Sequence, residues 1–465
     1  MRNKLFGSRE FYHRVLAISV PIMVQNAITN FVSLLDNVMI GRVGTVEMSG
    51  VAIANQLLFV FNMLVFGAIA GAGIFGAQFF GNRDMDGVRH TLRFKLMICL
   101  VLAAACIGIF TAFGPQLINL YLKGEGAVED AEASLRYGLQ YIKVMYIGML
   151  PYAITQAYAG TLRETGETLL PMKAGIVAVL VNLTFNYILI FGHFGAPRMG
   201  VVGAAIATVL SRFVELAIVV SWAHRHAVRF PYITGLYRSL HIPGRLFRDI
   251  LRRGPPLLVN EGLWAAGMAM LNQCYSLRSL DVVAATNISS TIWNLFACVY
   301  LALGSAISIM VGQELGAGDF EKAKVTARQT TAFSVAISIG VGLLMAFVGT
   351  YFPLIYRTTD TVRHLATNFI RIGACLMPFT AMTNALYFTL RAGGKTMVTF
   401  LFDSAFVWLI NIPVAYVLSR YTAMPILLLY ACCQSLEIIK CIIGTVMVKK
   451  GIWINNIVAD KKGEV

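Results

Sequence analysis

The sequence predicts an all-α integral membrane protein with twelve transmembrane helices in two six-helix lobes. Hydrophobic residues make up 57% of the 465 residues and charged residues only 13%, about half of the ~25% that soluble domains carry. Twelve stretches are apolar for the ~20 residues that a membrane helix needs. Two motifs also recur in the second half of the chain, which indicates a duplicated unit.

The duplication is visible in two pairs of motifs. GAQFFGNRD, which begins at Gly76, matches VGQELGAGD, which begins at Val311, at an offset of 235 residues. TLRETGET, from Thr161, matches TLRAGGKT, from Thr389, at an offset of 228. Two similar offsets predict an ancestral unit of roughly 220 residues that was duplicated. Duplicated halves around a site near the bilayer midplane are a common plan of membrane transporters.

The twelve apolar stretches follow one another with short breaks. We expect helices near residues 15–40, 48–75, 92–113, 134–160, 169–192, 199–222, 255–277, 282–310, 328–350, 364–390, 397–418 and 424–447. Glycine and proline mark the breaks, as they do between helices generally. Pro255 and Pro256 are expected in the first turn of the seventh helix, where a missing N–H costs nothing.

Lys and Arg residues predict the orientation. With a cytoplasmic N-terminus, the inner segments hold 26 of them and the outer segments seven, so both termini are expected in the cytoplasm. Six helices per lobe give the two lobes one orientation, related by a pseudo-two-fold axis along the membrane normal. We therefore expect a lobe over residues 1–222, a cytoplasmic linker with seven Arg over 223–253, and a lobe with a short tail over 254–465.

Four polar residues of the first half are expected at membrane depth. Asp36 lies about 20 residues into the first helix, near the outer third of the bilayer. Asn182 and Asn186 share one face of the fifth helix, and Thr208 lies at a similar depth in the sixth. Asp36, Asn182 and Thr208, with Asn186, form an oxygen set for Na⁺, or Asp36 alone carries H⁺. The alternatives are an interfacial Asp36 and asparagines that only join helices.

The second half offers Glu261 as a cation-binding residue. Asn260 and Trp264 flank it and could give a substrate a polar neighbour and an aromatic face. Asp403, in the eleventh helix, is a third candidate for substrate binding. The alternative for Glu261 is a carboxylate favoured by a helix N-terminus. Two further pairs at i, i+3 are expected to be local ion pairs, namely Arg212 with Glu215 and Glu437 with Lys440.

Motifs for enzymes and cofactors are absent from the sequence. None of the eight cysteines forms a CxxC or Cys/His metal spacing. There is no P-loop, HExxH or GxSxG motif, and no aspartate-rich pair at a helix end. We expect no enzyme activity and no cofactor, and transport would have to draw on an ion gradient.

Several of these segments resemble the multidrug and toxic compound extrusion (MATE) family. They are SLLDNVMIGRVGT, GAQFFGNRD, NLTFNYILIFG, VNEGLW, and LRAGGKT followed by FLFDSAFVWLI. The resemblance implies two six-helix lobes driven by Na⁺ or H⁺, with Asp36 as the coupling carboxylate of the first lobe. Asn182 and Thr208 match its partners, whereas several relatives have Asp where this chain has Asn186. Glu261 matches an acid of the seventh helix, and the acid that some members carry in the tenth helix is missing.

The expected function is therefore cation-coupled antiport that exports drugs and other amphiphilic organic cations by alternating access. The alternatives are a flippase for a lipid-linked precursor and a membrane-embedded transferase. The expected partners are small organic cations and membrane lipid, with no nucleic acid, and the chain is expected to be a monomer. Its expected place is the bacterial inner membrane, as a multi-pass protein.

Overall fold

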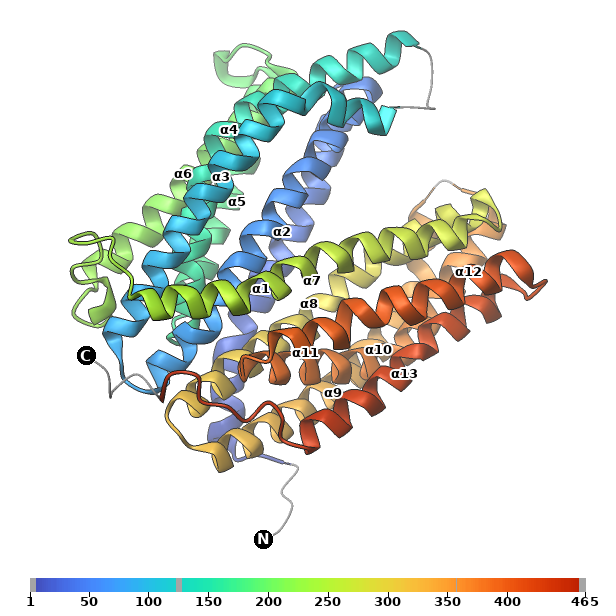
Figure 1. Cartoon of the computed structure of the whole chain (residues 1–465). Helices are drawn as coiled ribbons and strands as arrows, with labels where there is room; N and C mark the ends of the chain where they lie inside the picture. The colour runs from blue at the N-terminus through green and yellow to red at the C-terminus, as the bar shows by residue number, and fades with distance from the viewer. Residues whose placement is uncertain (1–5, 123–127, 357, 460–465) are drawn as a thin grey trace. The chain divides into compact units, whose positions relative to one another are not determined.

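The structure is a computed structural model that describes residues 6–122, 128–356 and 358–459. Within these residues it is built from helices (Figure 1). They are α1 Arg9–Gly41, α2 Thr45–Gly81, α3 Met85–Leu122, α4 Val128–Glu164, α5 Leu169–Phe191, α6 Gly200–Arg225, α7 Gly244–Ser276, α8 Leu280–Gly316, α9 Phe320–Tyr351, α10 Asp360–Ala392, α11 Thr396–Phe400, α12 Ile412–Tyr421 and α13 Ile426–Lys449. All twelve stretches predicted to be helical are helical.

The eleventh predicted helix has an irregular centre. Two π-helical segments, Leu401–Ala405 and Val407–Asn411, join α11 to α12, so that Thr396–Tyr421 forms one span. Single π-helical turns are rare and occur frequently at functional sites. This irregularity contains Asp403 and was not predicted from the sequence.

Helix α7 begins earlier than expected, and the prediction that Pro255 and Pro256 lie in its first turn is wrong. The helix begins at Gly244 and both prolines lie inside it. The residues before the prolines include four arginines, so they do not belong to an apolar stretch. The prolines leave the carbonyl groups of Leu251 and Arg252 without their usual helical donors. Both residues are exposed, so water can supply the missing hydrogen bonds.

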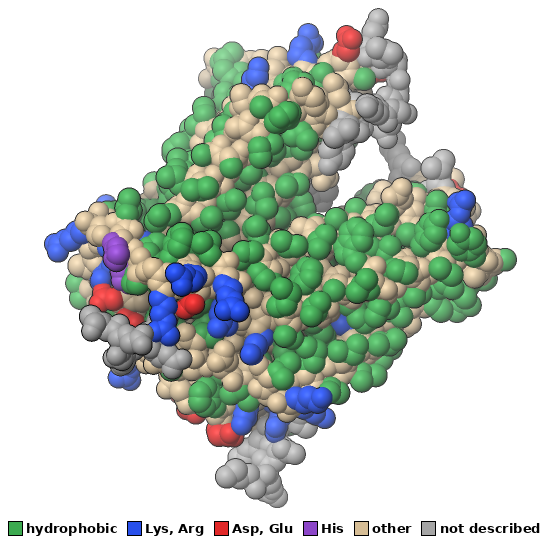
Figure 2. Space-filling view, viewed as in Figure 1, with side chains coloured by type: hydrophobic (Ala, Val, Ile, Leu, Met, Phe, Trp, Pro, Cys, Tyr) green, Lys and Arg blue, Asp and Glu red, His purple; other side chains and the backbone are tan. Residues whose placement is uncertain are grey.

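Nine spans in the described part of the chain have the length and apolar composition of membrane helices. Helices α4 and α7 are more polar than these. Figure 2 shows hydrophobic side chains over the flanks of the helices and most charged side chains near helix ends. Exposed apolar flanks of this kind are stable in lipid and unusual in water.

The chain forms two compact units. The N-terminal unit comprises Val24–Gly76 and Met85–Ile250. In it, α5 packs against α6, and α4 packs against both α6 and α3. The C-terminal unit comprises Met1–Met23, Ala77–Asp84 and Leu251–Val465, and in it α10 packs against α8, α9 and α13.

These units differ from the expected boundaries because two pieces of the first 222 residues pack with the second half. In α1, Val15, Ile18 and Ile22 form a buried cluster with α8 residues such as Leu303 and Met310. The other piece, Ala77–Asp84, ends α2. Both pieces gain apolar burial from helices far away in the sequence, which a reading of consecutive stretches cannot detect.

The two copies of the repeated motif contact each other. A Cβ atom at Gly81 would lie 1.9 Å from the carbonyl oxygen of Gln313, and one at Gly316 would lie 1.9 Å from that of Gln78. Real Cβ atoms do not approach so closely, so both crossings require glycine. The motifs are thus related in space as well as in sequence.

The segment after α13 packs against this crossing. The Gln78 side chain donates to the carbonyl groups of Ala392 (3.0 Å) and Asn455 (3.2 Å) and accepts from the Ile457 N–H (2.9 Å). Trp453 is fully buried. The described part of the tail is therefore an ordered component of the C-terminal unit.

The expected linker is held against the start of α3. Arg89 donates to the carbonyl groups of Pro231 and Tyr232, and Arg93 donates to those of Gly235 and Leu236. The two guanidinium groups donate to carbonyl oxygens of this loop that would otherwise accept hydrogen bonds from water. The linker is therefore packed against the N-terminal unit rather than being a free tether.

Lys95 is one of the 26 Lys and Arg residues that the sequence assigns to the inner segments, but the structure places it in the interior. It lies inside α3, is fully buried, and places its Nζ 2.6 Å from a carboxylate oxygen of Glu164. Thr161 accepts a further hydrogen bond from it at 3.0 Å. A buried lysine keeps its charge only with such partners, so Lys95 belongs to the interior.

Candidate functional site

The four polar residues predicted for the first half lie together in the N-terminal unit. Asn186 Nδ2 donates to Asp36 Oδ1 at 2.6 Å and to Asn182 Oδ1 at 3.1 Å. Asn182 Nδ2 in turn donates to Thr208 Oγ1 at 3.1 Å. One chain of hydrogen bonds therefore connects α1, α5 and α6. We call these four residues the Asp36 cluster.

The local structure explains the alignment. Gly192 adopts a left-handed conformation (φ 77°) and ends α5, as glycine commonly does at helix C-termini. The chain then turns back into α6, which packs against α5. Asn182 and Asn186 lie one helical turn apart on the face of α5 that meets Thr208.

The Asp36 cluster is nearly closed to solvent yet has an unused acceptor. Asn182 is 5% exposed and Asn186 is 1% exposed, while Asp36 is half-buried. Asn186 Oδ1 has no hydrogen-bond partner among the described residues. A buried amide oxygen normally has one, so a bound cation would satisfy it. Carboxylate, amide and hydroxyl oxygens are suitable ligands for a hard cation.

Other charged and polar side chains surround the Asp36 cluster. The Arg212 guanidinium, one turn beyond Thr208, acts electrostatically on Asp36. It pairs with Glu215 at 3.4 Å, which confirms that predicted ion pair. The buried Tyr141 side chain interacts with both Asp36 and Thr208. Tyr141 could not be predicted from the sequence, because it is one of five tyrosines in α4 and nothing in the local pattern sets it apart.

A second polar cluster lies in the C-terminal unit and contains two predicted residues. Asn260 Nδ2 donates to Asp403 Oδ2 at 3.1 Å, and Asn260 Oδ1 accepts from Ser404 Oγ at 2.8 Å. The other oxygen of Asp403 lies 2.7 Å from Lys440 Nζ. The direct partner of Lys440 is Asp403 on the preceding helix, whereas the expected partner Glu437 acts on Lys440 only electrostatically.

Glu261 lies beside this second cluster. It is half-buried and lies well inside α7, which begins at Gly244, so the helix N-terminus explanation does not hold. Arg391 and Asp403 act on it electrostatically, and Tyr387 is a hydrogen-bond partner. Trp264 is 41% exposed. The roles of Glu261, Asn260, Trp264 and Asp403 in binding remain predictions.

Lys440 and Lys95 are the interior residues that sequence analysis misassigned. Lys440 lies within the apolar helix α13, and a cation at that depth is itself a signal of function. The i, i+3 rule assigned it a local partner instead. Lys95 lies in the first turn of the helix predicted over 92–113, where its charge places it with the basic residues of the adjoining inner segment.

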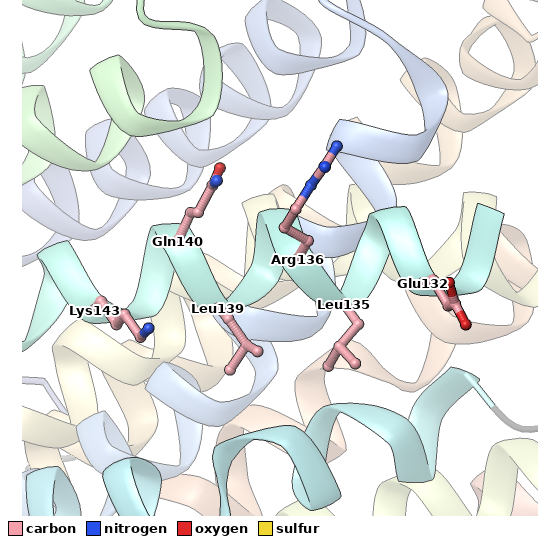
Figure 3. A pocket seen from close by; sticks show the side chains of 6 residues that line it. All are labelled: Glu132, Leu135, Arg136, Leu139, Gln140 and Lys143. Carbon is pink, nitrogen blue, oxygen red and sulfur yellow. The ribbon is translucent and has the colours of Figure 1, made fainter. Parts of the chain in front are cut away.

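A shallow depression of about 340 Å³ lies elsewhere, along α4. Figure 3 shows its lining side chains projecting from that one helix. They are Glu132, Leu135, Arg136, Leu139, Gln140 and Lys143. None of them belongs to either polar cluster. Within the described residues, no three His, Cys, Asp or Glu side chains gather as a metal site would require.

The chain is similar to multidrug resistance proteins along most of its length. It is 24% identical over 420 residues to a probable multidrug resistance protein NorM of Thermotoga maritima, covering 90% of this chain and 88% of the relative. It is 25% identical over 410 residues to the probable multidrug resistance protein NorM of Bacillus anthracis, covering 86% and 87%.

A crystal structure of a MATE protein in its straight conformation is also similar. Its TM-score is 0.84 at 19% identity, over 96% of this chain and 97% of that one. This likeness confirms the predicted fold class of twelve transmembrane helices in two lobes. The family model MatE matches residues 21–188 and 256–417, which is most of the chain. The chain therefore belongs to the multidrug and toxic compound extrusion (MATE) family.

Proposed function

We propose that this protein is an antiporter that exchanges Na⁺ or H⁺ for amphiphilic organic cations and exports them by alternating access. The observation that carries the proposal is the Asp36 cluster. It joins one carboxylate to two amides and a hydroxyl on three helices. A carboxylate at membrane depth is expensive to bury unless it binds a cation or a proton. The multidrug resistance names of the relatives support drugs as substrates over a lipid-linked precursor.

The proposed mechanism uses the Asp36 cluster as the coupling site. A cation or proton entering from outside neutralises Asp36, and Asn186 Oδ1 or Thr208 Oγ1 can add a ligand for Na⁺. Loading changes the charge in the helix interface, and this charge change biases the equilibrium between inward-open and outward-open states. Exchange of one monovalent ion for one monovalent organic cation moves no net charge, so the ion concentration gradient drives the substrate, with about 1.4 kcal/mol for each tenfold difference.

Everted membrane vesicles test the proposal directly. A fluorescent organic cation is added outside the vesicles, and either a Na⁺ gradient or a pH gradient is imposed. We expect one of the two gradients to drive dye accumulation, and collapsing it with the matching ionophore to abolish that accumulation. Equal dye movement without any gradient would contradict coupled transport.

The topology can be tested at Ser239, an exposed residue of the linker. We propose that the linker and both termini are cytoplasmic, so Ser239→Cys should resist an impermeant thiol reagent added to intact cells. Tyr421→Cys is the matched control, because Tyr421 is 71% exposed and its loop is expected outside. The exposed Cys375 is first replaced by alanine. Labelling at Ser239→Cys comparable to that at Tyr421→Cys would refute the orientation.

Glu261 should contribute to the handling of cationic substrates in the C-terminal unit. Glu261→Gln keeps the size of the side chain and removes its charge. We expect export of a cationic dye to fall roughly tenfold, the effect of about 1.4 kcal/mol of lost attraction, with little change for a neutral dye. Glu321→Gln is the control, because the Glu321 side chain is 85% exposed. Equal losses for both dyes would assign Glu261 a structural role.

A further inference from the structure

The C-terminal unit contains a fixed cation within its membrane-spanning helices. Lys440 is the fifteenth residue of the apolar helix α13 and is only 5% exposed. Its Nζ lies 2.7 Å from Asp403 Oδ1. The ammonium group also lies 5.4 Å from the centre of the Phe402 ring. Lys440 is therefore anchored by a carboxylate and by an aromatic face, both in the helix that precedes it.

Asp403 has its oxygens occupied on both sides. Oδ1 receives the Lys440 ammonium group, and Oδ2 accepts from Asn260 Nδ2 at 3.1 Å. Asn260 is itself fixed, because its Oδ1 accepts from the N–H (3.3 Å) and the hydroxyl (2.8 Å) of Ser404. The Asp403 carboxylate is thus paired with the Lys440 ammonium group and accepts a hydrogen bond from the fixed amide of Asn260.

The Asp36 cluster differs, because the cation that acts on Asp36 from a distance, Arg212, is itself paired with Glu215 at 3.4 Å. The hydrogen bond that Asp36 receives comes from a neutral amide, Asn186 Nδ2. The remaining oxygen of that amide is buried and has no hydrogen-bond partner among the residues the structure describes. A cation that binds in the Asp36 cluster would coordinate the unsatisfied Asn186 Oδ1. A cation at Asp403 would instead be repelled by the Lys440 ammonium group.

Charge repulsion makes the affinity of Asp403 for a second cation much lower than that of the Asp36 cluster. Two like charges about 4 Å apart, at the effective dielectric of a protein near its surface, lower a binding constant by roughly a thousandfold. Lys440 therefore excludes Na⁺ from Asp403.

We infer that Lys440 is a built-in substitute for a coupling cation at Asp403, so that the Asp36 cluster alone binds the ion that drives exchange. This inference rests on the proposed antiport. If Lys440 replaces a coupling cation in this way, Asp403 positions Lys440 and Asn260 instead of binding substrate. The exchange then carries one coupling ion per cycle at the Asp36 cluster.

Purified protein in proteoliposomes tests the inference, with dye exchange measured against the concentration of the driving ion, Na⁺ or H⁺. The wild type should show single-site dependence, with a Hill coefficient of about 1. Lys440→Met keeps the apolar stem and leaves Asp403 without its partner. This variant should acquire a second ion site, and its Hill coefficient should rise toward about 2. Lys440→Arg should retain the wild-type dependence.

The double variant Asp403→Asn with Lys440→Met keeps the test valid if Lys440→Met does not fold. It removes both charges together, so it should show single-site dependence whatever its turnover. A wild type with two-site dependence that the double variant reduces to one would overturn the inference, because Asp403 would then bind an ion. A folded Lys440→Met variant with unchanged dependence would also overturn it.

The same measurements separate this inference from the proposed function. If wild-type exchange ignores both ions, or if Asp36→Asn exchanges dye with unchanged ion dependence, the antiport proposal fails. If wild-type exchange depends on the ion through Asp36 and only the Lys440 variants deviate from expectation, the inference alone fails.

Discussion

Asp36→Asn should abolish ion-driven export while leaving the protein folded. The substitution keeps the size of the side chain and an oxygen that can accept from Asn186 Nδ2, which lies 2.6 Å from Asp36 Oδ1. It removes the charge that would attract Na⁺ or H⁺. Because exchange of one monovalent ion for one monovalent dye moves no net charge, the ion concentration gradient is the driving force. A tenfold ion gradient supplies about 1.4 kcal/mol, so loss of coupling should lower the sustained dye ratio about tenfold.

The measurement is dye accumulation in everted vesicles under the driving gradient, normalised to the amount of protein. Asp86→Asn is the matched control, because Asp86 has a 75% exposed side chain in a surface ion pair with Arg89. Exposed pairs contribute little, so this variant should export normally. Wild-type accumulation by Asp36→Asn would assign Asp36 to the interfacial alternative.

Gly316→Ala and Gly81→Ala should strongly destabilise the C-terminal unit. A Cβ atom at either position would lie 1.9 Å from a backbone carbonyl oxygen of the other motif. A backbone carbonyl group cannot move out of the way by a rotamer change, as a side chain can. The ends of α2 and α8 would therefore have to separate to relieve the clash. Overpacking of this kind costs about 1–3 kcal/mol and occasionally more. We expect lower melting temperatures in detergent and poor yield for both variants.

Gly340→Ala provides the control for the glycine substitutions. Gly340 lies inside α9, and a Cβ atom there would meet nothing within 4 Å. Alanine favours an open helical position by about 0.5–1 kcal/mol, so this variant should melt at or slightly above the wild-type temperature. If Gly316→Ala were as stable as Gly340→Ala, the close crossing of the repeated motifs would be wrong.

The residues of the Asp36 cluster could be predicted from helical periodicity and from the cost of burying a charge. Asn182 and Asn186 share a face because they are four residues apart, and α6 returns Thr208 to their depth because the connection is short. Asp36 joins them from α1, 146 residues before Asn182 in the chain, and its prediction rested on the high cost of burying a charge in lipid. The geometry places all four together, whereas their function stays a proposal.

Long-range pairings could not be predicted in the same way. Lys440 has Glu437 at i−3, yet it bonds to Asp403, 37 residues earlier. The burial of Trp453 after α13 and the mutual contact of Gly81 and Gly316 also depend on tertiary packing. The sequence identified the repeated motifs as copies, but a repeat predicts similar structures and does not predict that the two copies touch.

The central claim is obligate exchange at Asp36, and ion counterflow tests it most directly. Proteoliposomes are loaded with an organic cation dye, no ion gradient is imposed, and the membrane potential is clamped. The account predicts that dye leaving the vesicles drives Na⁺ or H⁺ inward, and that Asp36→Asn shows no such ion uptake. Dye efflux from wild-type vesicles with neither ion entering would contradict it.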